Sequence, residues 1–252
     1  MISLKNSKEL AAMKRAGQIS AGALRAGGRV VQPGVTTAEI NAVIHDYIIK
    51  RGAKPNFLGY GGFPGSACIS VNEELIHGIP GGRVLHEGDI VSIDGGAVLD
   101  DFHGDNAWTF AVGEVSEEAK ALMEATRISL ERAIAAARPG NRLGDIGHAV
   151  QSYVEPLGFH VVRQYVGHGI GRSLHEEPEV PNFGSPDRGM RLLPGMVIAI
   201  EPMIAIGTHQ VRVLSDDWTV VNAKGDLCAH YEHTVAITES GPVILTIPPE
   251  DE

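Results

Sequence analysis

The chain has 252 residues, of which 43% are hydrophobic and 21% are charged, and its formal net charge is −10. The acidic balance argues against non-specific nucleic-acid binding, which needs a basic face. No apolar run is long enough for a membrane span, and the N-terminus lacks the apolar core of a signal peptide. Two cysteines, Cys68 and Cys228, are too few for a disulfide framework, so we expect a cytoplasmic protein.

The first part of the chain predicts two helices followed by strands. Asn6 and Glu9 form a capping box, and the helix that follows is expected to end near Pro33. Thr36 and Glu39 form a second capping box, ahead of a second helix. Strand-like runs follow at residues 67–71, 89–96 and 106–113.

The same order of elements then begins again. Ser116 is expected to cap a helix over 117–137, and a second helix is expected over 145–158. Strand-like segments follow at residues 160–169, 196–205, 210–221 and 230–238.

Several short phrases recur in the same order in the two parts. The phrase GDIVSID at 88–94 matches GMVIAIE at 195–201, and HGI at 77–79 matches HGI at 168–170. Any two segments of mixed helix and strand share some short phrases, but these matches end twice on an acid. We therefore favour an internal duplication, with halves of about 5–113 and 116–245 related by a pseudo-two-fold axis within one catalytic domain, 1–252.

The duplication places Asp94 and Glu201 at equivalent strand ends, where the two halves would meet. Two carboxylates at such a position repel each other unless a cation lies between them. Asp105 precedes one strand, Glu232 begins another, and His168 lies between glycines at a strand end. Four carboxylates and one imidazole suit two divalent cations, or one cation with partial protonation. This oxygen-rich set favours Mn, Fe or Co, and it also admits Zn.

Each of these residues also has a structural interpretation when it is taken alone. Asp94 and Asp105 could belong to turns, Glu201 could form a salt bridge, and Glu232 could be an exposed strand residue. A histidine between glycines, such as His168, could fill a tight turn. Their joint placement at strand ends in both halves favours the metal site.

Further residues could form the rest of an active site. His77 and His175 could be loop residues, or they could donate hydrogen bonds to a tetrahedral intermediate if they line the cleft. Aromatic residues gather before the strand at 67–71, and their interpretations as plain core or as an apolar side-chain pocket both stay open. The aromatic residues are Phe57, Tyr60 and Phe63, the same apolar stretch supplies Cys68, and Trp218 follows an acidic pair in the second half.

Six motifs in this order carry a resemblance to a known family. CISVNEELIHGIP, SIDGG, DFHGDNAWTF, GHGIGRSLHEEP, AIEPM and HYEHTVAI resemble the type I methionine aminopeptidases, of the M24 "pita-bread" metallopeptidase family. The likeness extends from about residue 4 to residue 245. It implies an α+β pita-bread fold in which a central antiparallel sheet is covered by helices.

The resemblance also implies a role for each site residue. Asp94 would bind one metal ion, Asp105 and Glu232 would bridge two ions, and His168 and Glu201 would bind the second. Glu201 would also accept the proton of the attacking water. His175 would bond the scissile carbonyl, and His77 would contact the peptide nitrogen or the departing amine. The methionine pocket would be lined by Tyr60, Phe63, Cys68 and Trp218, with Phe57 at its edge.

The implied substrate is the N-terminal methionine of a nascent chain, preferably with a small second residue. Phe63 and Leu174 differ from the residues that are frequent at these positions in bacterial relatives. The difference bears on which side chain the pocket selects and not on the hydrolysis itself. The resemblance implies a monomer. No zinc-binding extension precedes the first helix, so any contact with the ribosome is expected to use the catalytic domain's own surface.

Three other functions fit the sequence less well. A proline-specific aminopeptidase or dipeptidase of the same fold would carry a separate N-terminal domain, whereas the catalytic pattern here begins almost at the first residue. A non-catalytic binding module would have lost ligands, and all five positions keep competent ones. Creatinase-like hydrolases lack this ligand set.

Overall fold

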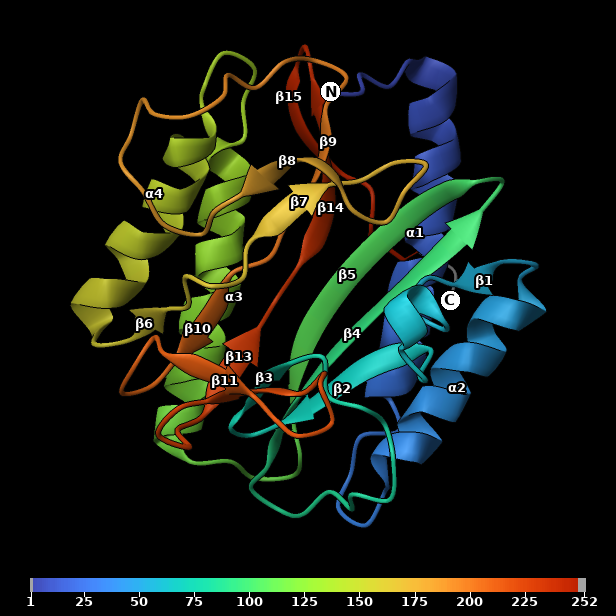
Figure 1. The fold of residues 1–252 in the computed structure, drawn as a ribbon, viewed down its shortest axis with the longest axis vertical. Coiled ribbons are helices and arrows are strands. Elements are labelled where there is room, and N and C mark those ends of the chain that lie inside the picture. The colour runs from blue at the N-terminus through green and yellow to red at the C-terminus, as the bar shows by residue number, and fades with distance from the viewer. Residues whose placement is uncertain (1, 249–252) are drawn as a thin grey trace.

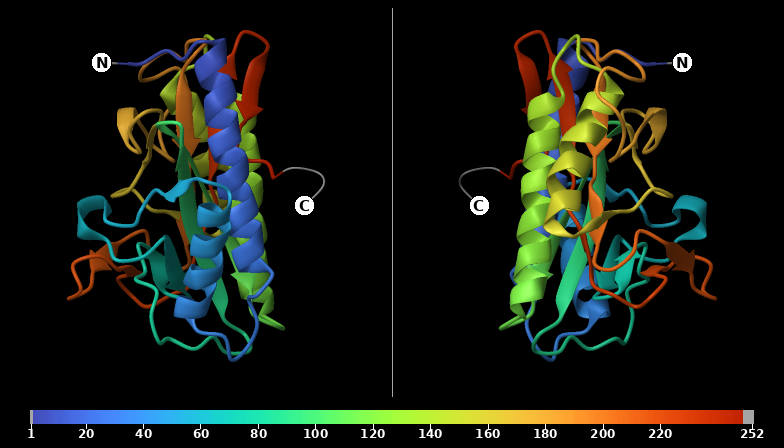
Figure 2. Two further views of the ribbon diagram at one scale, coloured as in Figure 1. Left: turned by 90° about the vertical axis from the view of Figure 1, so that its right-hand side faces the viewer. Right: turned by 90° about the vertical axis from the view of Figure 1, so that its left-hand side faces the viewer.

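The structure is a computed structural model that describes residues 2–248. Helices cover one face of a set of antiparallel sheets, and the loops of the opposite face project away from them (Figures 1 and 2). The α-helices in this part of the chain are α1 (Ser7–Gly28), α2 (Thr37–Lys50), α3 (Glu117–Ala136) and α4 (Leu143–Val154). None of the helices within residues 2–248 combines the length and the apolar character that a bilayer crossing requires.

The two helix starts predicted in the first half are confirmed by local hydrogen bonds. The Asn6 side chain accepts from the backbone amides of Lys8 and Glu9, and the Glu9 carboxylate accepts from the Asn6 amide. Thr36 and Glu39 form the same capping box ahead of α2. Each box satisfies amides that the first helical turn leaves unpaired.

The first half builds a sheet around one long strand. This sheet has the order β1-β4-β2, with β5 paired to the other edge of β4 along its length, and all pairs are antiparallel. Helices α1 and α2 cover it, and α1 lies so close to β5 that a side chain at Gly104 would approach within 2.5 Å of the Gly17 Cα. The strands are β1 (Lys54–Pro55), β2 (Ala67–Val71), β4 (Ile90–Leu99) and β5 (Phe102–Ala111).

The second half repeats this pairing. Its sheet has the order β15-β14-β9-β7-β8, so β9 lies between β7 and β14 as β4 lies between β2 and β5. Helices α3 and α4 pack against each other on this half (Figure 1). The strands are β7 (Gly167–Gly169), β8 (Glu176–Val180), β9 (Val197–Ile200), β14 (His233–Thr238) and β15 (Gly241–Ile244).

Two small sheets complete the fold, and one of them joins the halves. β3 of the first half pairs with β12 of the second, with Ile76 opposite Val220. The first small sheet contains β3 (Glu74–Ile76), β12 (Val220–Asn222) and β11 (Val211–Val213). The second contains β6 (His160–Val161), β10 (Met203–Ala205) and β13 (Cys228–His230), and two 3-10 turns are η1 (Tyr60–Gly62) and η2 (Glu155–Leu157).

Some predicted boundaries are wrong. Helix α1 ends at Gly28, before the expected Pro33, and α4 begins at Leu143 and ends at Val154. The predicted strands at 160–169, 196–205 and 210–221 are each divided into two short strands.

The positions expected for two acids also need correction. Asp94 does not end a strand and Asp105 does not precede one, because each lies inside the long β4-β5 hairpin. Asp94 is opposite Ala107, and Asp105 is opposite Gly96. Residues 94 and 96 share one face of β4, so the two acids project from the same face of the hairpin.

Candidate active site

One cavity, of about 150 Å³, gathers every predicted site residue. Its polar wall comes from both halves, and its apolar wall comes mainly from the segment before β2. The lining residues are Phe57, Tyr60, Phe63, Cys68, His77, Asp94, Asp105, His168, Leu174, His175, Glu201, Trp218 and Glu232. Leu174, which the sequence marked only as a departure, is therefore also part of the wall.

Equivalent elements of the two halves carry the acids. Asp94 lies in β4 and Glu201 directly follows β9, its counterpart. Asp105 lies in β5 and Glu232 directly precedes β14, the counterpart of β5. Opposite Asp105, Gly96 leaves the room that the acid needs, since a Cβ there would lie 2.8 Å from Asp105 Oδ1.

The four acids are largely buried, and several of their oxygens make no hydrogen bond among the described residues. Asp105 and Glu232 are buried, and Asp94 and Glu201 are partly buried. Asp94 Oδ1, Asp105 Oδ1 and Glu232 Oε1 have no hydrogen-bond partner among the described residues. A buried carboxylate oxygen without a partner is costly, so these atoms need a cation or protons.

The pKa values of the acids reflect the same need. Burial, followed by the neighbouring carboxylates, raises the pKa of Asp94, Glu201 and Glu232 well above the ordinary values. Burial raises the pKa of Asp105 to about 7, against a smaller opposing effect of the Asn106 amide. Divalent cations would favour the ionised carboxylates that burial disfavours.

His168 presents a free lone pair to this acidic wall. Its Nδ1 lies 2.8 Å from the carbonyl oxygen of Gly169, which can only accept, so Nδ1 carries the proton. Burial lowers the pKa of His168 to about 4, which keeps the ring neutral at pH 7. Ligand atoms of Asp105, His168 and Glu232 all lie within 4.8 Å of one another. The donor set therefore fits a divalent metal ion.

Glu201 lies between two imidazoles. Its Oε1 is 3.6 Å from His168 Nε2, and its Oε2 is 3.6 Å from His230 Nε2. Its backbone oxygen accepts from the side chain of Asn182 at 2.9 Å. His230 is buried, and neither of its ring nitrogens makes a hydrogen bond among the described residues.

Sequence reasoning assigned no role to His230. The spacing to Glu232 could have indicated that His230 faces the site. The two residues are two positions apart, and side chains at that spacing in an extended chain share a face. Asn182 was missed as well, and nothing in its local sequence marks it.

The apolar wall is formed by packed rings around Cys68. Phe63 is 2% exposed, and its ring centroid lies 5.1 Å from that of Trp218 in an edge-to-face arrangement. The Asp216 side chain fixes the turn that carries Trp218 by accepting from the amides of Trp218 and Thr219. Phe57 and Cys68 are also buried, so the wall is rigid and suits an unbranched apolar side chain.

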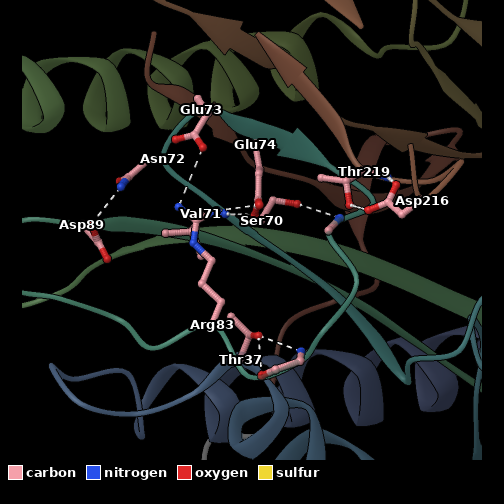
Figure 3. Close-up of polar contacts among 12 residues, drawn as sticks. Thr37, Ser70, Val71, Asn72, Glu73, Glu74, Arg83, Asp89, Asp216 and Thr219 are labelled. Atoms are coloured by element: carbon pink, nitrogen blue, oxygen red, sulfur yellow. Dashed lines mark hydrogen bonds and ion pairs between the residues drawn. The ribbon is translucent and has the colours of Figure 1, made fainter. Parts of the chain in front are cut away.

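His77 lies on a loop that a polar network holds in place. His77 has a positive φ of 58°, a conformation in which histidine is tolerated. The neighbouring Gly78 amide donates to Ser70 Oγ, and Thr37 Oγ1 exchanges hydrogen bonds with the backbone of Gly81 (Figure 3). Arg83 pairs with Glu74 at the end of the same loop. Burial lowers the pKa of His77 to about 4, so this ring is also neutral.

His175 lies at the mouth of the cavity, on a loop anchored from the N-terminus. The adjacent Glu176 accepts from the amides of Arg172 and Ser173 and from Lys5 Nζ at 2.5 Å. The His175 ring centroid is 4.2 Å from that of His168. Lys5 is another residue that sequence reasoning missed.

Comparison with known proteins agrees with this architecture. The family model described as metallopeptidase family M24 matches residues 11–239. A methionine aminopeptidase of Clostridium acetobutylicum is 54% identical, covering 98% of this chain and 99% of that protein. Methionine aminopeptidase 1 of Bacillus subtilis is 52% identical, with 98% and 99% covered.

A solved structure shows the same fold. The crystal structure of a methionine aminopeptidase from Thermotoga maritima superposes with a TM-score of 0.96 at 48% identity, covering 98% of this chain and 99% of that one. The expected α+β pita-bread fold is thereby confirmed. The chain belongs to metallopeptidase family M24 and, within it, to the type I methionine aminopeptidases.

Proposed function

We propose that the cavity removes the N-terminal methionine from peptides and nascent proteins by metal-assisted hydrolysis. The observation that carries this proposal is the cluster of buried, unpartnered carboxylate oxygens beside a neutral imidazole, at the base of an apolar pocket. Hydrolytic metal sites combine such a ligand set with a shaped, largely dry cavity.

Two divalent ions suit the donor set best. Asp94, Asp105, Glu201 and Glu232 bring four negative charges when ionised, which two dications balance. His168 supplies one nitrogen, and the predominance of oxygen favours Mn, Fe or Co and admits Zn. When bound, such ions lower the pKa of water and polarise a carbonyl group.

The protein's own side chains then handle protons and orientation. Glu201 accepts a proton from the attacking water as the C–O bond forms. It then returns this proton to the departing amine as the C–N bond breaks. His175 donates a hydrogen bond to the scissile carbonyl oxygen, and His77 contacts the peptide nitrogen. Both act as neutral imidazoles that bind without repelling the metal ions.

The apolar wall supplies the selectivity. Phe57, Tyr60, Phe63, Cys68 and Trp218 surround a space that accepts the long, unbranched methionine side chain, and its sulfur suits contacts with aromatic rings. His77 and His175 also line the cavity, and in their proposed roles they flank the peptide bond next to the second residue. This arrangement supports a preference for a small second residue.

We also propose that residues 1–252 act as one catalytic domain, in the cytoplasm and as a monomer. Its partners would be nascent-chain N-termini, with any ribosome contact made through the domain's own surface. The support is that both halves contribute to one cavity. Residues 1 and 249–252 of this predicted domain lie outside the described part of the chain.

A peptide panel tests the substrate assignment. Protein supplied with Mn or Co is expected to release methionine from Met-Ala-Ser and to act hardly at all on Met-Lys peptides or on Xaa-Pro peptides. Chromatography of the released amino acid measures each rate. Equal turnover of Xaa-Pro peptides would assign the site to a proline-specific peptidase, and no turnover with any metal would favour a non-catalytic binding module.

A further inference from the structure

One hydrogen bond crosses the mouth of the cavity between the two halves. The Tyr60 hydroxyl lies 2.7 Å from His175 Nδ1, and the two ring centroids are 5.3 Å apart. Tyr60 belongs to η1 in the first half, and His175 directly precedes β8 in the second. The Tyr60 side chain is 46% exposed, so it contributes less to the apolar wall than the buried Phe63 does.

The turn that carries Tyr60 is built to hold this position. Gly59 and Gly61 both have positive φ, and the Gly59 amide bonds the carbonyl oxygen of Phe63 at 2.8 Å. A side chain at Gly61 would lie 3.3 Å from the Trp218 ring, so the turn rests against the pocket wall. The phenol is therefore presented to His175 from a tight turn anchored at both ends.

The chemistry of the two groups gives this hydrogen bond a direction. In a neutral imidazole one nitrogen donates and the other accepts. A phenol O–H is a stronger donor than an imidazole N–H, and an imidazole nitrogen is a stronger acceptor than a phenol oxygen. The favoured arrangement therefore has Tyr60 donating to Nδ1 of His175, which leaves the proton on Nε2.

The neighbouring His168 is fixed in the opposite tautomer. Its Nδ1 must donate to the Gly169 carbonyl oxygen, so its Nε2 is an acceptor. Two imidazoles whose centroids are 4.2 Å apart are thus set differently by their partners. One is suited to ligate a cation, and the other is suited to donate a hydrogen bond.

We propose that Tyr60 is a positioning residue whose hydroxyl holds His175 as the Nε2–H tautomer and fixes the plane of its ring. This inference deepens the proposed function, because the role of His175 as a donor to the scissile carbonyl depends on an Nε2–H group. Tyr60 thereby links the pocket entrance of one half to the hydrogen-bond donor of the other.

Nuclear magnetic resonance tests the tautomer without any turnover. The zinc-loaded protein, labelled with 15N-histidine, is expected to give long-range couplings of the Nε2–H tautomer for His175, assigned by the loss of its signals in His175→Ala. In Tyr60→Phe the same signals should shift toward a mixture of tautomers. An Nδ1–H tautomer in the unaltered protein, or identical spectra in Tyr60→Phe, would overturn the proposal.

Kinetics test whether the hydroxyl acts through His175. Tyr60→Phe keeps the ring, so kcat for Met-Ala-Ser is expected to fall about three- to tenfold, with KM nearly unchanged, the size of one hydrogen bond. Because the hydroxyl is proposed to act only through His175, Tyr60→Phe should have no further effect in a His175→Ala background.

The matched control is Tyr153→Phe, on α4, where the phenol ring faces Arg132 away from the cavity. This variant should retain the unaltered kcat and KM. If Tyr60→Phe raised KM alone, and did so equally with and without His175, the phenol would be a pocket wall only. Because the spectra do not depend on turnover, they separate this result from a failure of the proposed function.

Discussion

Glu201 carries two proposed tasks, since it is both a metal ligand and the acceptor of a proton. It lies between His168 and His230, with one carboxylate oxygen 3.6 Å from each ring. Neither task can be done as well by a neutral amide, which lacks the negative charge and the basicity. The residue therefore offers the most direct test of the proposed chemistry.

Glu201→Gln is expected to lower kcat at least about 100-fold, the usual size of a lost acid-base group, and to reduce the bound metal. Steady-state rates and elemental analysis of protein purified without chelators measure the two effects. Glu118→Gln, an exposed position on α3, serves as the control and should alter neither. Full activity in Glu201→Gln would reject both roles.

The raised carboxylate pKa values predict how the metal-free protein responds to pH. The unfolded chain releases these protons near pH 4, whereas folded Asp105 retains its proton to about pH 7. The folded state then binds more protons than the unfolded state, so stability falls as pH rises. Below pH 6.5 the buried histidines oppose this trend, because burial lowers the pKa of His77, His168 and His230.

Above about pH 7 most of the unfolded histidines have also lost their protons, so the carboxylates decide how stability changes with pH. Metal-free protein should therefore lose stability as the pH rises above about 7, by up to about 1.4 kcal/mol per pH unit for each retained proton. Metal-loaded protein should lack this slope, since bound ions keep the acids ionised in the folded state. Urea unfolding at several pH values checks both curves, and identical slopes would contradict the metal assignment.

At the scale of elements, the loop that carries His175 depends on the N-terminal segment. The side chains of Lys5 and Glu176 are only 4% and 18% exposed, and they form an ion pair at 2.5 Å. Lys5→Ala leaves Glu176 without its cation, so the free energy of unfolding should fall by about 2 kcal/mol and kcat should also decrease. Urea unfolding and steady-state rates measure these changes.

An exposed ion pair provides the matched control for this test. Arg15 and Asp100 lie 2.8 Å apart, but their side chains are 56% and 64% exposed. Arg15→Ala should therefore cost less than about 1 kcal/mol and should leave kcat unchanged. Equal effects of the two substitutions would show that Lys5 does not support the loop.

The elements also show what the sequence could and could not predict. Helix starts were predicted well because a capping box such as Asn6 with Glu9 is a local pattern. Strand limits were predicted poorly because pairing with distant strands sets them, which is why Asp94 and Asp105 lie inside a hairpin rather than at strand ends. The residues that surround the acids, such as His230 and Lys5, depend on tertiary contacts in the same way.

At the scale of the whole molecule, the cavity lies where two similarly paired sheet units meet. Each half contributes a three-stranded unit in which the central strand and one neighbour carry or adjoin an acid. The repeated phrase GDIVSID and GMVIAIE pointed to one acid in each unit, Asp94 and Glu201, because it ends on these acids, but it did not show that Asp94 lies inside a hairpin. The asymmetric parts, including His77 in one half and His168 in the other, had to be inferred from the family resemblance.

The division of the acids between the halves has a consequence for assembly. Asp94 and Asp105 come from one half, and Glu201 and Glu232 come from the other, so neither half alone offers a complete coordination shell. Cations bound between the two halves would hold them together, and tight metal binding would require both halves to be in their folded positions. Any motion that parted the halves would release the ions and switch off hydrolysis in the same event.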